Sequence, residues 1–466
     1  MFESNGFSRL PKTPNPLPFE KMREHSHIRS SRRTVFFAAM AIFAGLLAAA
    51  TPACGRELTW SEAWEIARRQ NPTIQSAQMD LVTAREQVNE ALAGALPQVS
   101  LSGVYTRNLE IPVFFFDTLA IKIGQKNTYV GIAEVRQPLW LAGKVGTALK
   151  AAKSYLGQTE ATVEQTRQSV YVALAQTYYG SILARELVKT AETALERATQ
   201  HRDRARQMYE QGVVSEYDKI RAEVQVANLE PPLLEARKQY ALSLAALRRL
   251  LNLPPGDSLI IADSLDIQDT TTAPVNVEEA LQRRVELQAL HHARGMQKQL
   301  LSLAQRDLYL PMIYASANWQ TQTQAEDFAF KNYSWYRSAA AMLQVSLPLF
   351  DGFRTPSRVK QYRAALRRLD YAEADLRAAI RMDVEESQRE LERALRTVTV
   401  HEQNVREAQR GCDIAKVRYE SGVGTQLELL DSEFQLDQAR VARLKALYDA
   451  KIARIQLRRA LGETLD

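Results

Sequence analysis

Cysteine and histidine are scarce in this 466-residue sequence. The two cysteines, Cys54 and Cys412, are too few for a disulfide framework or a cysteine-rich metal site. The six histidines include no pair spaced four apart on a helix next to an acid, the arrangement of a helical metal site. We therefore expect no enzyme, no cofactor and no metal. Cys412 is expected to pack within a helix, and isolated histidines such as His201 to lie on helix surfaces.

Long apolar segments and an excess of one charge are also lacking after residue 53. No apolar run there approaches the ~20 residues of a membrane-spanning helix. The net charge of +6 falls to +2 (53 basic against 51 acidic residues) once residues 1–53 are set aside. Charges of both signs alternate along segments such as Arg389–Arg393, which is typical of solvated helix faces. A nucleic-acid partner is therefore not expected.

Residues 1–53 are typical of a signal peptide with an N-terminal extension. Two arginines precede an apolar run over 35–50, and small residues follow it. At about 16 residues the run is shorter than the ~20 needed for a membrane anchor. Cys54 stands where a lipoprotein signal places its acylated cysteine, although Thr51 and Pro52 depart from the usual residues. Cys54 is thus a candidate lipidation site, and the sequence leaves its acylation open.

The rest of the chain contains an internal two-fold repeat. Residues 209–225 align without a gap on 419–435, at an offset of 210, and the same offset relates Leu247–Leu251 to Leu457–Leu461. We therefore divide the chain into a first repeat, an equatorial linker and a second repeat. Their bounds are 54–251, 252–276 and 277–461.

Each repeat is predicted to contain a helix, two strands, a very long helix, a glycine-containing turn and a medium helix. Two stretches, 147–210 and 357–420, each lack an internal proline, and apolar residues recur at helical spacing along the second. Each would form a helix ~96 Å long. Alternation of apolar and polar residues predicts strand pairs within 97–138 and 311–348.

The alternating segments have the length and pattern of lipid-spanning β-strands. The smallest transmembrane barrels use about eight strands, so a chain that offers four must share its barrel with other copies of itself. Two alternatives stay open. One alternative is that the strands belong to a small soluble sheet and do not cross lipid. The other is that the protein is an exported coiled-coil scaffold of the cell envelope, which explains the helices but needs no amphipathic strands.

Motifs at the junctions of these segments connect the chain to a known family. Gln137–Trp140 (Gln-Pro-Leu-Trp) and Leu347–Phe350 (Leu-Pro-Leu-Phe) each precede a glycine, and a Tyr-Glu-x-Gly-Val motif begins at Tyr209 and at Tyr419. On these residues and the repeat, the chain resembles the TolC-type outer-membrane factors from Leu58 to Leu461.

The resemblance implies a mainly α fold with transmembrane β structure. Three copies would contribute four strands each to a 12-stranded outer-membrane β-barrel, and their helices would form a long α-barrel across the periplasm. Such a homotrimer is a passive channel surrounded by outer-membrane lipid. It would conduct substrates from an inner-membrane RND or ABC transporter, through a periplasmic adaptor protein, in a tripartite efflux pump or a type I secretion system. The sequence does not identify the cargo.

By the resemblance, the two glycine-containing turns are periplasmic tips where the adaptor docks. The residues assigned to this role are Gly212, Val213, Gly422, Val423 and Gly424. The glycines also suit helix C-caps, and Ser215 and Thr425 suit the N-caps of the following helices.

Three acids near the tips, Asp218, Glu428 and Asp431, are candidates for the periplasmic aperture. Three-fold symmetry would repeat them as carboxylate rings that favour cations. The alternative is that each acid only complements the dipole at a helix N-terminus. Gly424 stands where some family members have an arginine, so the arginine-based latch of those members is not assumed here. Val285 stands where the family usually has a proline, at the start of a helix.

Overall fold

The computed structural model describes most of the chain after the predicted signal. The described residues are 56–117, 119–255, 259–267, 275–307, 310–328 and 333–465. The predicted signal peptide at 1–53 and the candidate lipidation site Cys54 lie outside them. The compact unit described below runs from Glu57 to Asp466.

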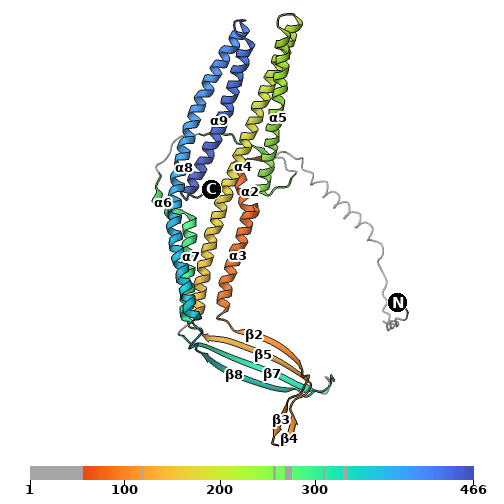
Figure 1. Ribbon diagram of the computed structural model, residues 1–466, viewed down its shortest axis with the longest axis vertical. Coiled ribbons are helices and arrows are strands. Elements are labelled where there is room, and N and C mark those ends of the chain that lie inside the picture. Colours follow the sequence, from red (N-terminus) through yellow and green to blue (C-terminus); the bar gives the residue numbers. More distant parts are fainter. Residues whose placement is uncertain are drawn as a thin grey trace, which may run out of the picture. The chain divides into compact units, whose positions relative to one another are not determined.

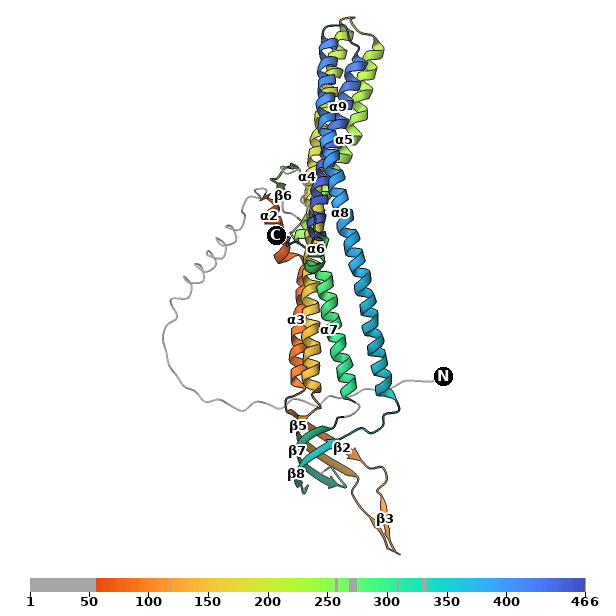
Figure 2. The same cartoon turned by 90° about the vertical axis from the view of Figure 1, so that its left-hand side faces the viewer.

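Long helices make up most of this unit, and a curved antiparallel sheet continues from one end of them (Figures 1 and 2). Its first half contains β1 (Arg56–Leu58), α2 (Trp60–Gln70), α3 (Pro72–Ala93), β2 (Gln98–Arg107), β3 (Val113–Phe116), β4 (Leu119–Lys122), β5 (Asn127–Trp140), α4 (Lys144–Glu210) and α5 (Glu216–Leu251). Its second half contains β6 (Leu259–Ile261), α6 (Val277–Arg283), α7 (Val285–Arg306), β7 (Met312–Ala325), β8 (Tyr336–Ser346), α8 (Arg354–Glu420) and α9 (Gln426–Ala460).

Two very long helices set the scale of the unit. α4 and α8 contain 67 residues each, which corresponds to ~100 Å at the α-helical rise. α4 packs along α5 and α8 along α9 as two hairpins, while α3 and α7 accompany the ends of α4 and α8 nearer the sheet (Figure 1). Among the described helices, none is both long enough and apolar enough to cross a lipid bilayer.

The single helix expected at the start of each repeat is broken in two, and that expectation was wrong. α2 ends before Asn71 and α3 begins at Pro72. The proline ring disfavours helical backbone angles at the residue before it, and Asn71 accordingly has an extended backbone with ψ 124°. Arg284 adopts a similar backbone, with ψ 122°, between α6 and α7, although Val285 follows it instead of a proline. Side-chain contacts of Arg284 therefore have to stabilise the second break.

Each break is tied to the far end of a medium helix. The Asn71 side chain donates to the carbonyl of Leu250, near the end of α5, at 2.8 Å. The Arg284 guanidinium donates to the carbonyl of Ala460, the last residue of α9, at 3.2 Å. Both side chains are almost fully buried, so these bonds join segments that are distant in the sequence.

Two carboxylates neutralise the buried Arg284. Its guanidinium lies 2.9 Å from Glu286 and 2.6 Å from Asp383. Burial alone lowers the pKa of this guanidinium, but the hydrogen bonds to Glu286 and Asp383 outweigh burial and raise the pKa above its ordinary value. The break between α6 and α7 is therefore built around a permanent, paired charge that also contacts α8.

Four antiparallel strands, in the order β2-β5-β7-β8, form the main sheet. β5 and β7, which come from different halves of the chain, pair along most of their length in its centre. β3 and β4, which lie between β2 and β5 in the sequence, form an additional hairpin. The sequence analysis predicted no strands in this segment. This hairpin extends past the sheet at the end remote from the helices (Figure 1).

The main apolar core lies where α2, α4, α5, β6 and α9 meet. Tyr178 of α4 is its largest fully buried side chain. The Tyr178 hydroxyl lies 2.7 Å from the carboxylate of Asp263 and 2.9 Å from the carbonyl of Leu58. Burial and the bond to Asp263 raise the pKa of Tyr178, so the phenol stays protonated and serves as a donor. The core thus attaches the segment after α5 to the middle of α4.

Arg284→Met is expected to lower thermal stability far more than Arg283→Met. The first change leaves Glu286 and Asp383 without their buried partner, which costs about 3 kcal/mol. Arg283 is more than half exposed, and its ion pair with Glu279 contributes less than about 1 kcal/mol. Thermal unfolding of the detergent-purified protein measures both variants. Equal midpoints for the two would contradict the buried role of Arg284.

Candidate functional site

The two hairpins end in turns of the same construction. Gly212 and Gly422 follow the ends of α4 and α8 with φ 75° and 76°, a conformation that glycine adopts without a steric penalty. The next residues, Val213 and Val423, donate from their N–H groups to carbonyls five residues back, at 2.8 Å and 3.0 Å. This is a Schellman closure, so both glycines are helix caps.

Each tip exposes an apolar side chain. Val213 is 63% exposed and Val423 is 73% exposed. Gly424 differs, because a Cβ atom there would lie 3.0 Å from the Cβ of Arg418. A side chain at position 424 would therefore crowd Arg418 at the end of α8.

The three acids predicted near the tips have different surroundings. Asp218 and Ser215 form a capping box at the start of α5, in which the Ser215 hydroxyl lies 2.6 Å from the Asp218 carboxylate. Glu428 lies 3.7 Å from the Arg418 guanidinium across the second turn, and Asp431 is exposed. Asp218 belongs to one hairpin and the other two acids to the second, so one chain by itself forms no ring of them.

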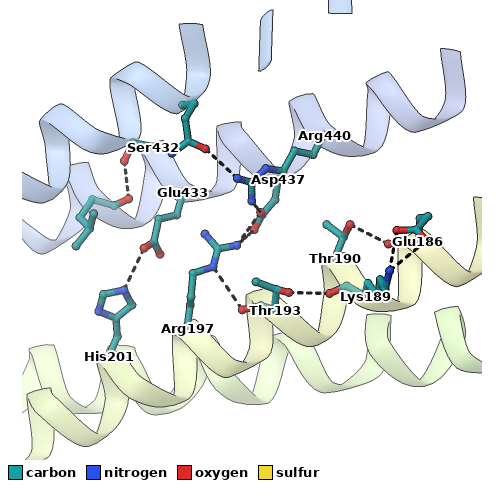
Figure 3. Close-up of polar contacts among 12 residues, drawn as sticks. Glu186, Lys189, Thr190, Thr193, Arg197, His201, Ser432, Glu433, Asp437 and Arg440 are labelled. Atoms are coloured by element: carbon teal, nitrogen blue, oxygen red, sulfur yellow. Dashed lines mark hydrogen bonds and ion pairs between the residues drawn. The ribbon is translucent and has the colours of Figure 1, made fainter. Parts of the chain in front are cut away.

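A polar contact between α4 and α9 joins the two hairpins some turns away from the tips (Figure 3). Arg197 donates to both carboxylate oxygens of Asp437, at 2.5 Å and 2.6 Å. One helical turn nearer the tips, the His201 ring lies 3.2 Å from the carboxylate of Glu433. All four side chains are less than a quarter exposed, so water screens these pairs weakly. We call these four residues the hairpin junction.

The charge state of Glu433 follows from its neighbours. Burial raises the pKa of Glu433, but the hydrogen bond and charge of His201, together with the charges of Arg197 and Lys416, outweigh burial and hold the pKa below its ordinary value. Glu433 is therefore ionised at neutral pH, and the stability that its ionisation contributes is lost only on acidification.

The sequence analysis missed this junction and was wrong to place His201 on a helix surface, since its side chain is 14% exposed. The available signal was spacing. Arg197 and His201 lie four residues apart, as do Glu433 and Asp437, so each pair shares one helix face and the two pairs are complementary. Cys412, by contrast, is buried within α8 as expected.

The main sheet has one apolar and one polar face. Residues directly opposite each other in neighbouring strands share a face. The apolar face includes the rows Val99–Val135–Ala317–Ala341 and Leu101–Ala133–Trp319–Ala339. The polar face includes the rows Ser100–Glu134–Asn318–Ala340 and Ser102–Ile132–Gln320–Ser338. Leu101 on the apolar face is 84% exposed in the single chain, so this face lacks a covering layer.

Both outer strands of this sheet have an open edge. β2 pairs with β5 alone and β8 with β7 alone within the described sheet, and the open edges are ten and eleven residues long. Open edges of this length pair readily with strands of another chain. The sheet of one chain therefore offers two edges to which further strands could be added.

Exposed aromatic rings gather at both ends of the sheet. Trp140 and Phe350 lie where β5 and β8 lead into the long helices, and Phe328 and Trp335 lie at the opposite end. Bands of aromatic side chains on either side of an apolar surface are typical of β-structure in a lipid bilayer.

A family model described as outer membrane efflux protein matches residues 64–253 and 276–463. The chain belongs to the outer membrane efflux protein family. Family membership confirms the predicted TolC-type resemblance. It also confirms the predicted location of the protein in the bacterial outer membrane, with an extension into the periplasm, and its predicted role in efflux transport.

Curated relatives of this efflux protein cover most of its length. Outer membrane protein TolC of Escherichia coli is 22% identical over 423 residues, which are 86% of this chain and 81% of TolC. Cobalt-zinc-cadmium resistance protein CzcC of Cupriavidus metallidurans is 24% identical over 346 residues, which are 72% of this chain and 78% of CzcC.

Solved structures share the fold. The outer membrane protein VceC from Vibrio cholerae has a TM-score of 0.69 at 20% identity, and the match covers 87% of this chain and 96% of VceC. A membrane protein from Pseudomonas aeruginosa has a TM-score of 0.72 at 19% identity, over 87% of this chain and 90% of that protein. At such identities the similarity establishes the fold alone.

Glu433→Gln is expected to destabilise the efflux protein at neutral pH but not in acid. The folded pKa of Glu433 lies below the unfolded value of about 4.3, so the contribution is complete above that value and is lost as the pH falls through the folded pKa. Thermal midpoints of wild type and variant should therefore differ at neutral pH and converge as the pH falls through the folded pKa of Glu433.

The exposed Glu420, at the end of α8, supplies the control. Glu420→Gln should leave the midpoint unchanged at both pH values. A difference between Glu433→Gln and wild type that persists undiminished into acid would show that ionisation of Glu433 is not what stabilises the junction.

Proposed function

We propose that three copies of this chain form one continuous conduit through the outer membrane and across the periplasm. β8 of each copy pairs with β2 of the next, and three sets of four strands close a 12-stranded barrel. The observation that carries this proposal is the amphipathic sheet with two open edges. In lipid every backbone group must be paired, and closure with other copies satisfies both edges at once.

The surfaces of the sheet support the same arrangement. Its apolar face, bounded by aromatic residues at both ends, turns to lipid, and its polar face lines the lumen. The helices continue the lumen as an α-barrel, for which α4 and α8 supply a length of ~100 Å. Two similar structures are described as outer membrane channels, those of MtrE from Neisseria gonorrhoeae and CmeC from Campylobacter jejuni.

We further infer that the protomer arose by tandem duplication, with repeats at 54–251 and 277–461 and an equatorial linker at 252–276. Three features support it. α4 and α8 have the same length, Gly212 and Gly422 have the same conformation, and the two helix breaks bond to carbonyls 210 residues apart, those of Leu250 and Ala460.

The hairpin tips are the proposed contact with a periplasmic adaptor. The exposed valines Val213 and Val423, next to the capping glycines, offer apolar anchors at the ends of otherwise charged hairpins. An inner-membrane RND or ABC transporter would load the conduit through that adaptor, in a tripartite efflux pump or a type I secretion system. The cargo is not assigned.

The periplasmic aperture is proposed to be lined by Asp218, Glu428 and Asp431 from each copy. Asp218 keeps its capping bond to Ser215, and the Arg418 guanidinium partly neutralises Glu428. Asp431, exposed and close to the tip, is the acid best suited to attract cations.

Two measurements test the conduit itself. Purified full-length protein should migrate as a heat-dissociable trimer and should produce ion currents across planar lipid bilayers. A coiled-coil scaffold of the envelope, the alternative function, would give neither. A protein that stays monomeric in detergent and never conducts overturns the proposal.

Asp218→Asn and Asp431→Asn are expected to lower the preference of the channel for cations. Each change removes three charges from the aperture of a trimer, while asparagine can still accept the capping hydrogen bond at position 218. Reversal potentials in a salt gradient measure the effect. Glu216→Gln, in the same first turn of α5, is the matched control and should change selectivity less. Selectivity identical to wild type in both aspartate variants would exclude the aperture role.

A further inference from the structure

The internal repeat relates the strands of the main sheet in pairs. β5 and β8 correspond at an offset of 210 residues, at which Pro138 aligns with Pro348. β2 and β7 correspond at an offset of 214 residues, at which Pro97 aligns with Pro311. The contacts of one repeat can therefore be compared, residue by residue, with those of the other.

Strand register is the same in both repeats. Gln98 of β2 lies opposite Arg136 of β5, and the two offsets convert this pair into Met312 of β7 opposite Ser346 of β8. The sheet contains that second pair. A slip by one residue would exchange the two faces of a strand, so register is tightly specified in a sheet with one apolar face. The repeat therefore carries register correctly from one pair of strands to the other.

One strand pair has no counterpart within the described sheet. β5 pairs with β7 in the centre, where Glu134 lies opposite Asn318. The corresponding strands are β8 and β2, which lie at the two edges of the sheet and do not meet in one chain. The offsets convert the central pair into Gln344 opposite Val104. Under the proposed function, on which this inference rests, that pair joins β8 of one copy to β2 of the next.

The helices next to these strands have the same gap. α4 follows β5, α7 precedes β7, and these two helices pack together. The corresponding helices are α8, which follows β8, and α3, which precedes β2. In one chain α3 and α8 lie on opposite sides of α4 and α7 (Figures 1 and 2). Pairing of β8 with β2 of the next copy would bring α3 of that copy beside α8.

Two positions at this helix contact exchange their sizes between the repeats. Arg306, the last residue of α7, donates to the carbonyl of Ala142 at 2.9 Å and lies over Gly143, the N-cap of α4. At α8 the N-cap is Phe353, with φ 61° against 69° for Gly143. The last residue of α3 is Ala93. Each pair thus combines one large and one small residue, so both can fill the same contact without a gap or a clash.

The surfaces that would meet are apolar and uncovered in one chain. A hollow of about 440 Å³ lies beside the connector between β8 and α8, and its lining includes Leu347, Leu349 and Phe353. Phe353 is 69% exposed. Leu92 and Leu96, at the end of α3 and just after it, are also exposed. Burial of these two surfaces against each other removes apolar area from water.

We propose that β2 and α3 of one copy dock on β8 and α8 of the next copy in the way that β7 and α7 dock on β5 and α4 within the chain. Gln344 then lies opposite Val104 of the neighbouring copy, and Phe353 packs against its Ala93. A second copy of this chain is therefore the occupant of the hollow, and the contact repeats three times around the trimer.

Cysteine cross-linking of the full-length protein tests the strand register, in a Cys412→Ala background. Gln344→Cys combined with Val104→Cys is expected to react with dibromobimane, because directly opposite residues have Cβ atoms ~5 Å apart. β2 and β8 lie at opposite edges of one chain, so the expected product is a covalent trimer on a denaturing gel. Each cysteine alone should give only monomers.

Two slipped pairs supply the matched controls. Gln344→Cys is combined with Ser102→Cys or with Thr106→Cys, which lie two residues from Val104 on the same face. Both pairs should cross-link about fivefold less, because their Cβ atoms would be ~7–8 Å apart. A slipped pair that reacts better than the pair with Val104 overturns the register.

The helix contact is tested by exchanging sizes. Ala93→Phe should lower the temperature at which the trimer dissociates, since two large side chains would then meet. Adding Phe353→Ala should restore that temperature, because one residue of the pair is small again. Gln87→Phe, at an exposed position on another face of α3, is the control and should change nothing. A failure of Phe353→Ala to restore the trimer overturns the contact.

Ion conductance of the unreacted double-cysteine proteins separates this inference from the proposed channel. A conducting trimer that cross-links only through a slipped pair, or through no pair, overturns the inferred contact and leaves the channel intact. A protein that neither conducts nor forms trimers contradicts the channel, and the inference with it.

Discussion

Backbone hydrogen bonding at the two outer strands of one sheet is the constraint on which the rest of this protein depends. β2 and β8 leave two open edges, and the sheet between them exposes an apolar face. Water cannot satisfy such edges within lipid, and in the proposed trimer neighbouring copies pair with them instead. The proposed direction of the polar face and the proposed need for identical neighbours both follow from that requirement. The proposed function as a conduit is a consequence of closing the sheet in this way.

The helices meet a different requirement, because very long rods need fixed positions along one another. Apolar seams alone tolerate sliding by a turn, whereas buried polar contacts do not. Arg284 fixes the second helix break against α8 and α9, Tyr178 fixes the segment after α5, and the hairpin junction fixes α4 against α9. These contacts lie at different heights along the helices. Together they define how the two hairpins align.

The tips illustrate how one residue can meet two requirements. Asp218 completes a capping box, and Gly212 and Gly422 close their helices with positive φ. Local backbone chemistry is sufficient to explain these residues in a single chain. Their proposed roles in adaptor docking and in the aperture arise only when three copies bring them to the same axis. Asp431 has no such local explanation, which makes it the more informative acid.

The sequence by itself determined those features that depend on neighbours along the chain. Proline-free stretches with helical spacing indicated α4 and α8, alternation indicated the strands, and Gly-Val motifs located the two tips; together these motifs led to the family. Tertiary structure alone decided the contacts between distant segments. The pairing of His201 with Glu433, the break at Arg284 without a proline, and the β3–β4 hairpin depend on partners that no local period specifies. Burial of a charged side chain is decided by which helix packs against it, and only the folded chain contains that information.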